Sequence, residues 1–310
     1  MVDILKSVQK PFNIADAAAA EESKHDELLG KEGGRILLKS TTLNFVGNLT
    51  VEPTLRQHIS NDMGGILSLV YDIFASDVMN KNFDWIESAS RTLHTLNNAA
   101  IQPAAQSLLS QRNFDQMAEA VFKTLPVWPE QPQMQELIER ILQLLSRLVK
   151  VDDGSRRVMG SKALLLKLLV YYTREETHKS ALITLHTLMV RVDDFKKIMY
   201  ETHGFESKNL DSFVKKGKES YTAAREGQKW DDYCNVCSSL SAFVTIFDER
   251  SEDFQDLIVP LIRICADKTD KIRKNSAVLL AKLAQNENNK RVMQANNGTE
   301  VLASLQGALM

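Results

Sequence analysis

The stretch at 278–305, VLLAKLAQNENNKRVMQANNGTEVLASL, decides the fold because it joins two apolar helical patterns through a polar turn and a glycine. Leu279, Leu280 and Leu283 are spaced as on one face of a helix. The stretch at 43–70, LNFVGNLTVEPTLRQHISNDMGGILSLV, has the same order of features. Leu49 closes its first helical pattern, and Gly65 precedes the second. The two stretches predict a chain that repeats one helical unit.

The same outline recurs between these two stretches. It follows Leu148 and Leu188, and a weaker copy without the glycine follows Phe243. The anchors at the ends of the apolar helices are spaced between 40 and 55 residues; they are Leu49, Ala99, Leu148, Leu188, Phe243 and Leu283. Helical repeats of about 40–47 residues form stacked helix pairs or triplets. Neighbouring repeats must stack, since a single one cannot bury its own apolar face.

Composition supports a helical, folded chain. Of the 310 residues, 44% are hydrophobic and 25% are charged, which is enough for a sizeable core. Glycine (13) and proline (7) are scarce, so a turn-rich β architecture is not expected. The formal net charge of −2 lacks the strong basic balance of a nucleic-acid-binding domain.

Three cysteines cannot form a disulfide framework in a chain of this size, so we expect a reducing compartment. The N-terminal residues show no signal-peptide pattern, and no apolar run is long enough to span a membrane. These features predict a cytoplasmic protein.

The C-terminal stretch at 274–305 resembles an armadillo repeat of the armadillo/HEAT class. The matching residues are Asn275, Ala277, Leu280, Leu283, Asn289, Val292, Gly298 and Leu302. The resemblance implies an all-α, armadillo-like, right-handed superhelical solenoid of about six repeats over 35–310, whose third helices line a concave groove. Residues 1–34 are expected to form an N-terminal tail or a helical cap.

Two segments interrupt the repeats. The stretch at 125–133, LPVWPEQPQ, contains three prolines and predicts an extended connection. The stretch at 205–232 is rich in lysine and polar residues and predicts an insertion. Insertions in repeat proteins usually lie on one face, which is often the binding face. The insertion is therefore either a solvated loop or a partner-contacting element.

No pattern in the chain indicates catalysis, a metal or a cofactor. Cys234 and Cys237 have a Cys-x-x-Cys spacing, but no second ligand pair completes a zinc site, so both thiols are expected to pack in the core. Phosphate-binding loops, dinucleotide-binding loops and nucleophile elbows are absent from the sequence. We expect a protein that is not an enzyme, although a polar cluster in a closed pocket would indicate one.

The expected groove partly matches the pattern of importin-like armadillo proteins. In that family an asparagine on the third helix, with a tryptophan four residues earlier, clamps an extended basic peptide. Asn48 and Asn98 occupy the asparagine position, but Asn44 and His94 precede them by four residues instead of tryptophan. Later repeats have Arg147, Thr187, Ala242 and Lys282 at the asparagine position. This departure argues against a nuclear-signal receptor.

Basic residues lie one or two turns earlier on the same helical faces. They would attract an acidic or extended polypeptide, as in catenin-like armadillo grooves, or form an ordinary solvated face. The predicted protein-binding residues are Asn44, Asn48, Arg91, His94, Asn98, Arg140, Gln143, Arg147, Lys274, Asn275 and Lys282. The sequence thus predicts a scaffold or adaptor with a protein partner, and no membrane or nucleic-acid partner.

The C-terminal repeat also resembles the last armadillo repeat of a tetratricopeptide-plus-armadillo family that acts in axonemal dynein assembly. It is more distantly similar to the armadillo region of the myosin chaperone family. No tetratricopeptide repeat is present, so the chain would be an armadillo fragment or a standalone relative. The alternative function implied is a chaperone-linked cytoplasmic assembly factor for axonemal dynein or another motor complex.

Overall fold

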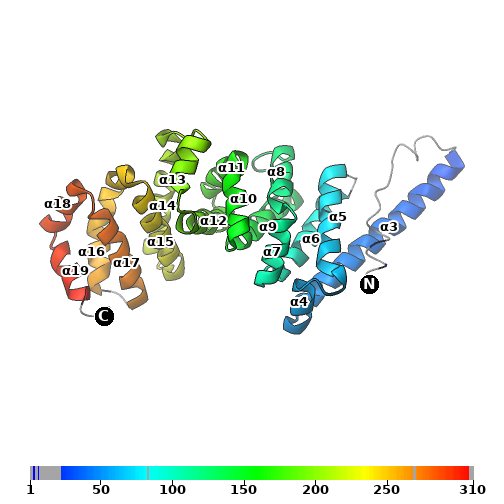
Figure 1. Ribbon diagram of the computed structural model, residues 1–310, viewed down its shortest axis with the longest axis horizontal. Coiled ribbons are helices and arrows are strands. Elements are labelled where there is room, and N and C mark those ends of the chain that lie inside the picture. The colour runs from blue at the N-terminus through cyan, green and yellow to red at the C-terminus, as the bar shows by residue number, and fades with distance from the viewer. Residues whose placement is uncertain (1–2, 4–5, 7–21, 82–83, 268–269, 307–310) are drawn as a thin grey trace. The chain divides into compact units, whose positions relative to one another are not determined.

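The computed structural model describes residues 3, 6, 22–81, 84–267 and 270–306. Every regular element among these residues is a helix, and no strand occurs in these ranges. The prediction of an all-helical fold is therefore confirmed. The chain divides into two compact units, 1–164 and 165–310. The boundary between them falls inside the range 35–310, for which the sequence predicts one repeat domain. The helices of each unit follow one another in chain order (Figure 1).

The first unit contains short helices that alternate with pairs of longer ones. Its elements are α3 (Glu22–Leu49), α4 (Pro53–Ser60), η1 (Met63–Gly65), α5 (Ile66–Asn80), α6 (Trp85–Ala99), α7 (Pro103–Gln111), α8 (Phe114–Thr124), α9 (Pro132–Leu148) and α10 (Asp152–Gly160). Helix α11 (Lys162–Tyr172) crosses the boundary between the units. Most of the expected tail or cap at 1–34 lies outside the described residues; α3 already begins at Glu22.

The second unit continues with a similar alternation. Its elements are α12 (His178–Arg191), α13 (Phe195–Lys197), η2 (Ile198–Thr202), η3 (Ser207–Leu210), α14 (Asp211–Glu226), α15 (Trp230–Ile246), η4 (Asp248–Leu257), α16 (Ile258–Asp267), α17 (Asp270–Leu283), α18 (Glu287–Ala295) and α19 (Gly298–Gln306). Helix α15 packs against α12, α14 and α17.

Prolines and glycines set the helix boundaries of the first unit. Pro53, Pro103 and Pro132 each occupy the start of a helix, where the missing N–H is not needed. Gly65 has a φ of 71°, which a residue with a side chain rarely adopts. The proline-rich stretch at 125–133 is a non-helical connection with several bends as far as residue 131, and its last proline begins α9.

The core of the first unit is built from equivalent leucines on three long helices. Leu43 of α3, Leu93 of α6 and Leu142 of α9 are all fully buried. Helix α6 packs against α3 on one side and α9 on the other. Each buried leucine stabilises the fold by about 1.5–3 kcal/mol relative to an exposed one.

A buried ion pair also joins α3 to α5. The Nζ atom of Lys39 lies 2.6 Å from Oδ1 of Asp77 and 3.5 Å from Oδ2 of Asp84. The Ser88 hydroxyl donates to the second Asp77 oxygen at 2.6 Å. The side chain of Asp77 is only 3% exposed, so this carboxylate depends on its partners.

The structure differs from the sequence expectation of a solvated loop at 205–232. Most of this segment forms α14, whose Phe213 and Tyr221 are buried. The Phe213 ring stacks between Tyr172 and Phe243, with centroids 4.4 and 4.6 Å apart. The physical reason is amphipathicity: the lysines lie on the outer face of α14, and its apolar residues fill the core of the second unit.

Candidate functional site

A groove of about 560 Å³ in the first unit brings together several of the predicted binding residues. It is lined by the long helices α3, α6 and α9, which supply Leu43, Asn44, Asn48, Glu87, Ser90, Arg91, His94, Gln133, Glu136 and Arg140. Five of these were predicted from the sequence: Asn44, Asn48, Arg91, His94 and Arg140.

Helical spacing explains why these side chains share one face. On α6, Glu87, Arg91 and His94 recur at intervals of four and three residues, so they lie in one row. Leu93 and Leu96 fall on the opposite side and are fully buried. The groove is therefore the polar face of helices whose apolar faces form the core.

The arginines of the groove are paired with acidic residues on their own helices. Arg91 binds the Glu87 carboxylate at 2.5 Å and also donates to the Asn44 side chain of α3. Arg140 binds the Glu136 carboxylate at 2.5 Å. The two Glu–Arg pairs occupy equivalent positions on α6 and α9, 49 residues apart. The expected basic stripe is thus balanced by acidic groups within the groove.

His94 and Asn48 also line the groove, and Asn98 lies next to His94 outside the lining. Asn98 donates from Nδ2 to the Thr50 hydroxyl at 3.0 Å, and the same atom lies 3.3 Å from Nε2 of His94. Burial and the nearby Arg140 charge lower the pKa of His94, so its ring is neutral at pH 7. Asn48 is exposed, and its side chain has no hydrogen-bond partner in the described part of the chain.

Gly47 makes room for the His94 ring. A Cβ atom at this position would lie 3.0 Å from Cδ2 of His94 and 3.4 Å from the Thr95 hydroxyl. The absence of a side chain at Gly47 therefore lets α6 approach α3 closely at the groove wall.

Three predicted residues of the first unit lie outside the groove lining: Asn98, which contacts His94 as described above, Gln143 and Arg147. Gln143 is exposed on α9. Arg147 is half-buried and donates to the main-chain carbonyl of Asn97 at the end of α6. The Asn97 amide in turn donates to the carbonyl of Arg140 at 2.9 Å. Arg147 therefore connects two helices and is not displayed to a ligand.

The remaining predicted residues, Lys274, Asn275 and Lys282, belong to α17 of the second unit and form no part of this groove. Asn275 accepts a hydrogen bond from the Ser238 hydroxyl at 2.8 Å and donates to the Lys271 carbonyl at 2.9 Å. Lys274 is exposed and Lys282 is half-buried.

The acidic partners Glu87 and Glu136 were not predicted from the sequence. The signal that reveals them is local, because each lies four residues before an arginine on a helix. Ser90 and Gln133 were also missed, and their helical spacing alone gives no reason to choose them over other polar residues.

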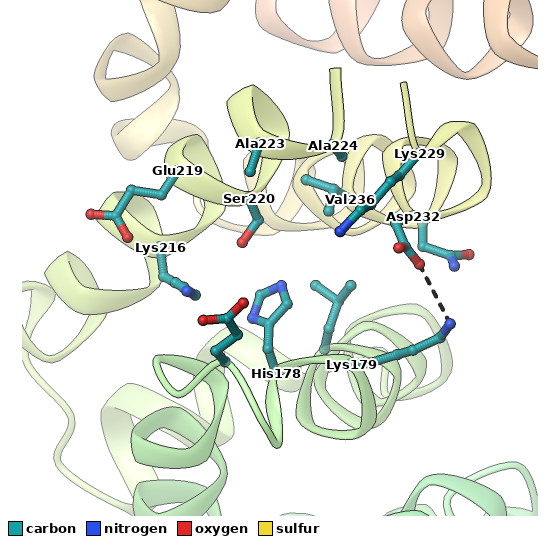
Figure 2. A pocket seen from close by; sticks show the side chains of 13 residues that line it. His178, Lys179, Lys216, Glu219, Ser220, Ala223, Ala224, Lys229, Asp232 and Val236 are labelled. Carbon is teal, nitrogen blue, oxygen red and sulfur yellow. Dashed lines mark hydrogen bonds and ion pairs between the residues drawn. The ribbon is translucent and has the colours of Figure 1, made fainter. Parts of the chain in front are cut away.

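A second cavity, of about 420 Å³, lies in the second unit between the start of α12, the middle of α14 and the start of α15. Figure 2 shows His178 and Lys179 facing Lys216, Ser220 and Lys229 across it. Lys179 pairs with Asp232 of α15 at 3.4 Å. No pattern in the sequence indicates this cavity.

The cysteines are buried, as expected for thiols that pack in a core. Burial raises the pKa of Cys265 to about 11, and it raises the pKa of Cys237 further above the usual range. Within the described ranges, no group of three or more potential ligands could hold a metal ion. Across the same ranges, no helix has the length and apolar character needed to cross a membrane.

No protein-family model and no curated protein matches this sequence. Among solved structures, the chain is similar to an engineered protein determined by a structural genomics consortium. The TM-score is 0.57 at 12% identity, over 92% of this chain and 98% of that one. The chain is also similar to a structure of the SYS-1/POP-1 complex, with a TM-score of 0.49 at 9% identity, over 94% of this chain and 60% of that one. At 12% identity, the first similarity describes the fold alone. The chain therefore has an all-helical fold, compatible with an α-solenoid, that a solved structure shares over nearly its whole length.

Proposed function

We propose that this chain is a non-enzymatic protein-interaction module that binds an extended polypeptide in the groove of α3, α6 and α9. In this proposal the chain is an armadillo-like right-handed superhelix of about six repeats, and it acts as a scaffold or adaptor. The observation that supports the proposal is the groove itself. Three successive long helices each contribute polar side chains to one continuous surface.

Extended main chain suits the chemistry of this surface. Each residue of an extended peptide offers one N–H donor and one C=O acceptor. The side-chain amide of Asn48 is exposed, and it can accept from the peptide N–H and donate to the peptide C=O. Packed helices lie about 8–10 Å apart, which corresponds to about three residues of an extended chain at roughly 3.3 Å each. A peptide that crosses the three helices would therefore contact the groove with about six or seven residues.

The charge balance of the groove refines the type of partner. A strongly acidic segment would have to displace Glu87 from Arg91 and Glu136 from Arg140. A segment with both acidic and basic residues could satisfy all four side chains. We therefore propose main-chain recognition with mixed-charge side chains, and the Glu–Arg pairs would set the register of the bound segment.

The test begins with a library of short random peptides, from which those that bind the full chain are selected. Asn48→Ala is expected to weaken groove-binding peptides by about two- to tenfold, since one hydrogen bond contributes about 0.5–1.5 kcal/mol. Gln116→Ala is the matched control, because Gln116 is an exposed amide on α8 outside the groove. Equal affinities for Asn48→Ala and Gln116→Ala would contradict the proposal.

Site-directed photocrosslinking gives an independent measurement. The native cysteines are buried, so a cysteine at position 48 can be labelled selectively with a photoreactive maleimide. Selected peptides should crosslink from Asn48→Cys and not from Gln116→Cys. Crosslinks of equal yield from both positions would show that the peptides do not bind in the groove.

A further inference from the structure

We propose that the cavity between α12, α14 and α15 is a second peptide-docking site, which takes an apolar side chain flanked by one basic and one acidic residue. This proposal does not depend on the groove of the first unit, because every residue that lines the cavity belongs to the second unit. It adds a second point of contact with a partner, of a different chemistry.

The floor of the cavity is apolar. Leu182 of α12, Ala224 of α14 and Val236 of α15 line it and are almost fully buried. The volume of about 420 Å³ lies within the range of about 300–1,000 Å³ that is typical of ligand sites. An apolar side chain that enters the cavity would exclude water from this floor, and burial of one large side chain stabilises a complex by about 1.5–3 kcal/mol.

The rim carries both signs of charge, and part of this charge is already compensated. Lys179 pairs with Asp232, as described above. Lys216 and Glu219 are three residues apart on α14, so they are neighbours on the helix surface and lie on the same side of the cavity (Figure 2).

Four charged side chains of the rim form no ion pair among the described residues: Lys216 and Glu219, whose charges balance on α14, and Glu175 and Lys229. Glu175, in the turn before α12, and Lys229, directly before α15, are exposed and have no ion-pair partner among the described residues. A ligand with one basic and one acidic group complements them. Lys229 also stands at the N-terminus of α15, where the helix dipole adds to the attraction for an acidic group.

A neutral histidine also lines the cavity. The Nδ1 atom of His178 lies 2.7 Å from the Tyr172 carbonyl, which can only accept, so Nδ1 carries the proton and Nε2 is an acceptor. Nε2 is buried and has no hydrogen-bond partner in the described structure. Burial lowers the pKa of His178, so the ring stays neutral at pH 7.

The experiment uses a random peptide library displayed against the full chain. Peptides that bind the cavity are identified by their loss of binding to Ala223→Trp, which fills it. Ala223 is exposed and lines the cavity; Ala281→Trp is the matched control, because Ala281 is an exposed alanine on α17 outside the cavity. We expect a loss of more than about tenfold for Ala223→Trp and less than about twofold for Ala281→Trp.

Charge reversal tests the proposed ligand. The cavity-binding peptides should contain an apolar residue with an acidic and a basic neighbour. Lys229→Glu should weaken them by about tenfold or more, and replacement of the acidic peptide residue by lysine should restore binding. Glu175→Lys should show the same reciprocity with the basic peptide residue. Both positions are exposed, so these variants decide the question even where Ala223→Trp does not fold.

Two results would overturn the proposal. The first is a library without any peptide whose binding depends on Ala223, Lys229 or Glu175. The second is a set of cavity-binding peptides whose charge preference is unchanged in Lys229→Glu and Glu175→Lys. Asn48→Ala separates this proposal from that for the first unit: it should weaken groove peptides and leave cavity peptides unaffected.

Discussion

Replacement of Lys39 by methionine should destabilise the first unit in a pH-dependent way. Lys39 of α3 and Asp77 of α5 form a pair whose side chains are 10% and 3% exposed. Methionine keeps an unbranched side chain of similar length and removes the ammonium group. The Asp77 carboxylate would then be left in the core with the Ser88 hydroxyl as its remaining hydrogen-bond donor.

The expected cost follows from the geometry of the pair. Removal of one member of a buried ion pair costs about 3–5 kcal/mol. The lower end, about 3 kcal/mol, is expected near neutral pH, because Ser88 still donates to Asp77. Burial raises the pKa of Asp77 above its usual value, and Lys39 opposes this shift. Loss of Lys39 should therefore raise the Asp77 pKa further.

The sign of the pH dependence follows from this shift. In the variant, the folded pKa of Asp77 lies further above the unfolded value of about 3.9 than in the wild type. The folded variant therefore takes up a proton more readily than the unfolded chain as the pH falls. Each unit of pKa corresponds to about 1.4 kcal/mol. The difference in stability between wild type and variant should shrink by about 1 kcal/mol or more between about pH 7.5 and pH 5.

Tryptophan fluorescence allows the first unit to be followed by itself. Trp85 and Trp128 lie in the first unit and Trp230 in the second, so a Trp230→Phe background confines the signal to the first. With a urea m-value of about 2 kcal/mol/M, a loss of 3 kcal/mol lowers the unfolding midpoint by about 1.5 M. The double variant Lys39→Met/Asp77→Leu should recover much of this loss, since no buried charge remains.

A cost below about 1 kcal/mol near neutral pH would contradict the prediction that the Asp77 carboxylate depends on Lys39. It would equally be refuted by a cost that stays constant as the pH falls, because Asp77 would then not be the group that responds to the loss of Lys39.

Three further predictions concern other parts of the chain. Gly154→Ala should lower the free energy of unfolding by more than about 2 kcal/mol, because the new Cβ would lie 2.1 Å from the Leu148 carbonyl oxygen. Gly160→Ala on the same helix meets open space and should raise it by about 0.5–1 kcal/mol. Urea unfolding of the two variants measures the difference. The three cysteines should react with a thiol reagent only as the protein unfolds, and rapid labelling of the native chain would contradict their burial. Burial lowers the pKa of His178 and His186, so the unfolded state binds protons at a higher pH than the folded state does. The melting temperature of the second unit should therefore fall as the pH drops below about 6.5. The double variant His178→Gln/His186→Gln should show a weaker dependence of the melting temperature on pH.

The helix ends were predictable because their signals are local. Leu49, Ala99, Leu148 and Leu283, chosen from the apolar periodicity, are the last residues of α3, α6, α9 and α17. Helix spacing, prolines and glycines fix such ends without any long-range information. The other two anchors, Leu188 and Phe243, fall three residues before the ends of their helices.

The role of α14 was not predictable in this way. Its lysines and polar residues suggest a solvated segment, and its fit depends on tertiary contacts. Gly217 illustrates this: a Cβ there would lie 2.8 Å from Leu240 and 3.2 Å from the Tyr172 hydroxyl. The sequence contains that glycine, but it does not show which neighbours approach it.

The two candidate sites differ in the same respect. Asn44, Asn48, Arg91, His94 and Arg140 follow from one helical face repeated along the chain, so the sequence could bring them together. The second cavity combines the turn before α12, the middle of α14 and the start of α15. Their proximity depends on how α12, α14 and α15 pack, which no local pattern encodes.

The hydrogen bonds between successive long helices have a consequence for biosynthesis. The Asn97 side chain binds the carbonyl of Arg140, and Arg147 binds the carbonyl of Asn97, so the partners are 43 and 50 residues apart. The side-chain hydroxyls of Tyr233 and Ser276 in the second unit, also 43 residues apart, share a hydrogen bond. Each of these contacts joins neighbouring repeats, so none requires the two ends of the chain to meet. As the ribosome releases the chain, each new long helix would meet a partner that has already emerged, so the protein can assemble from its N-terminal end during translation.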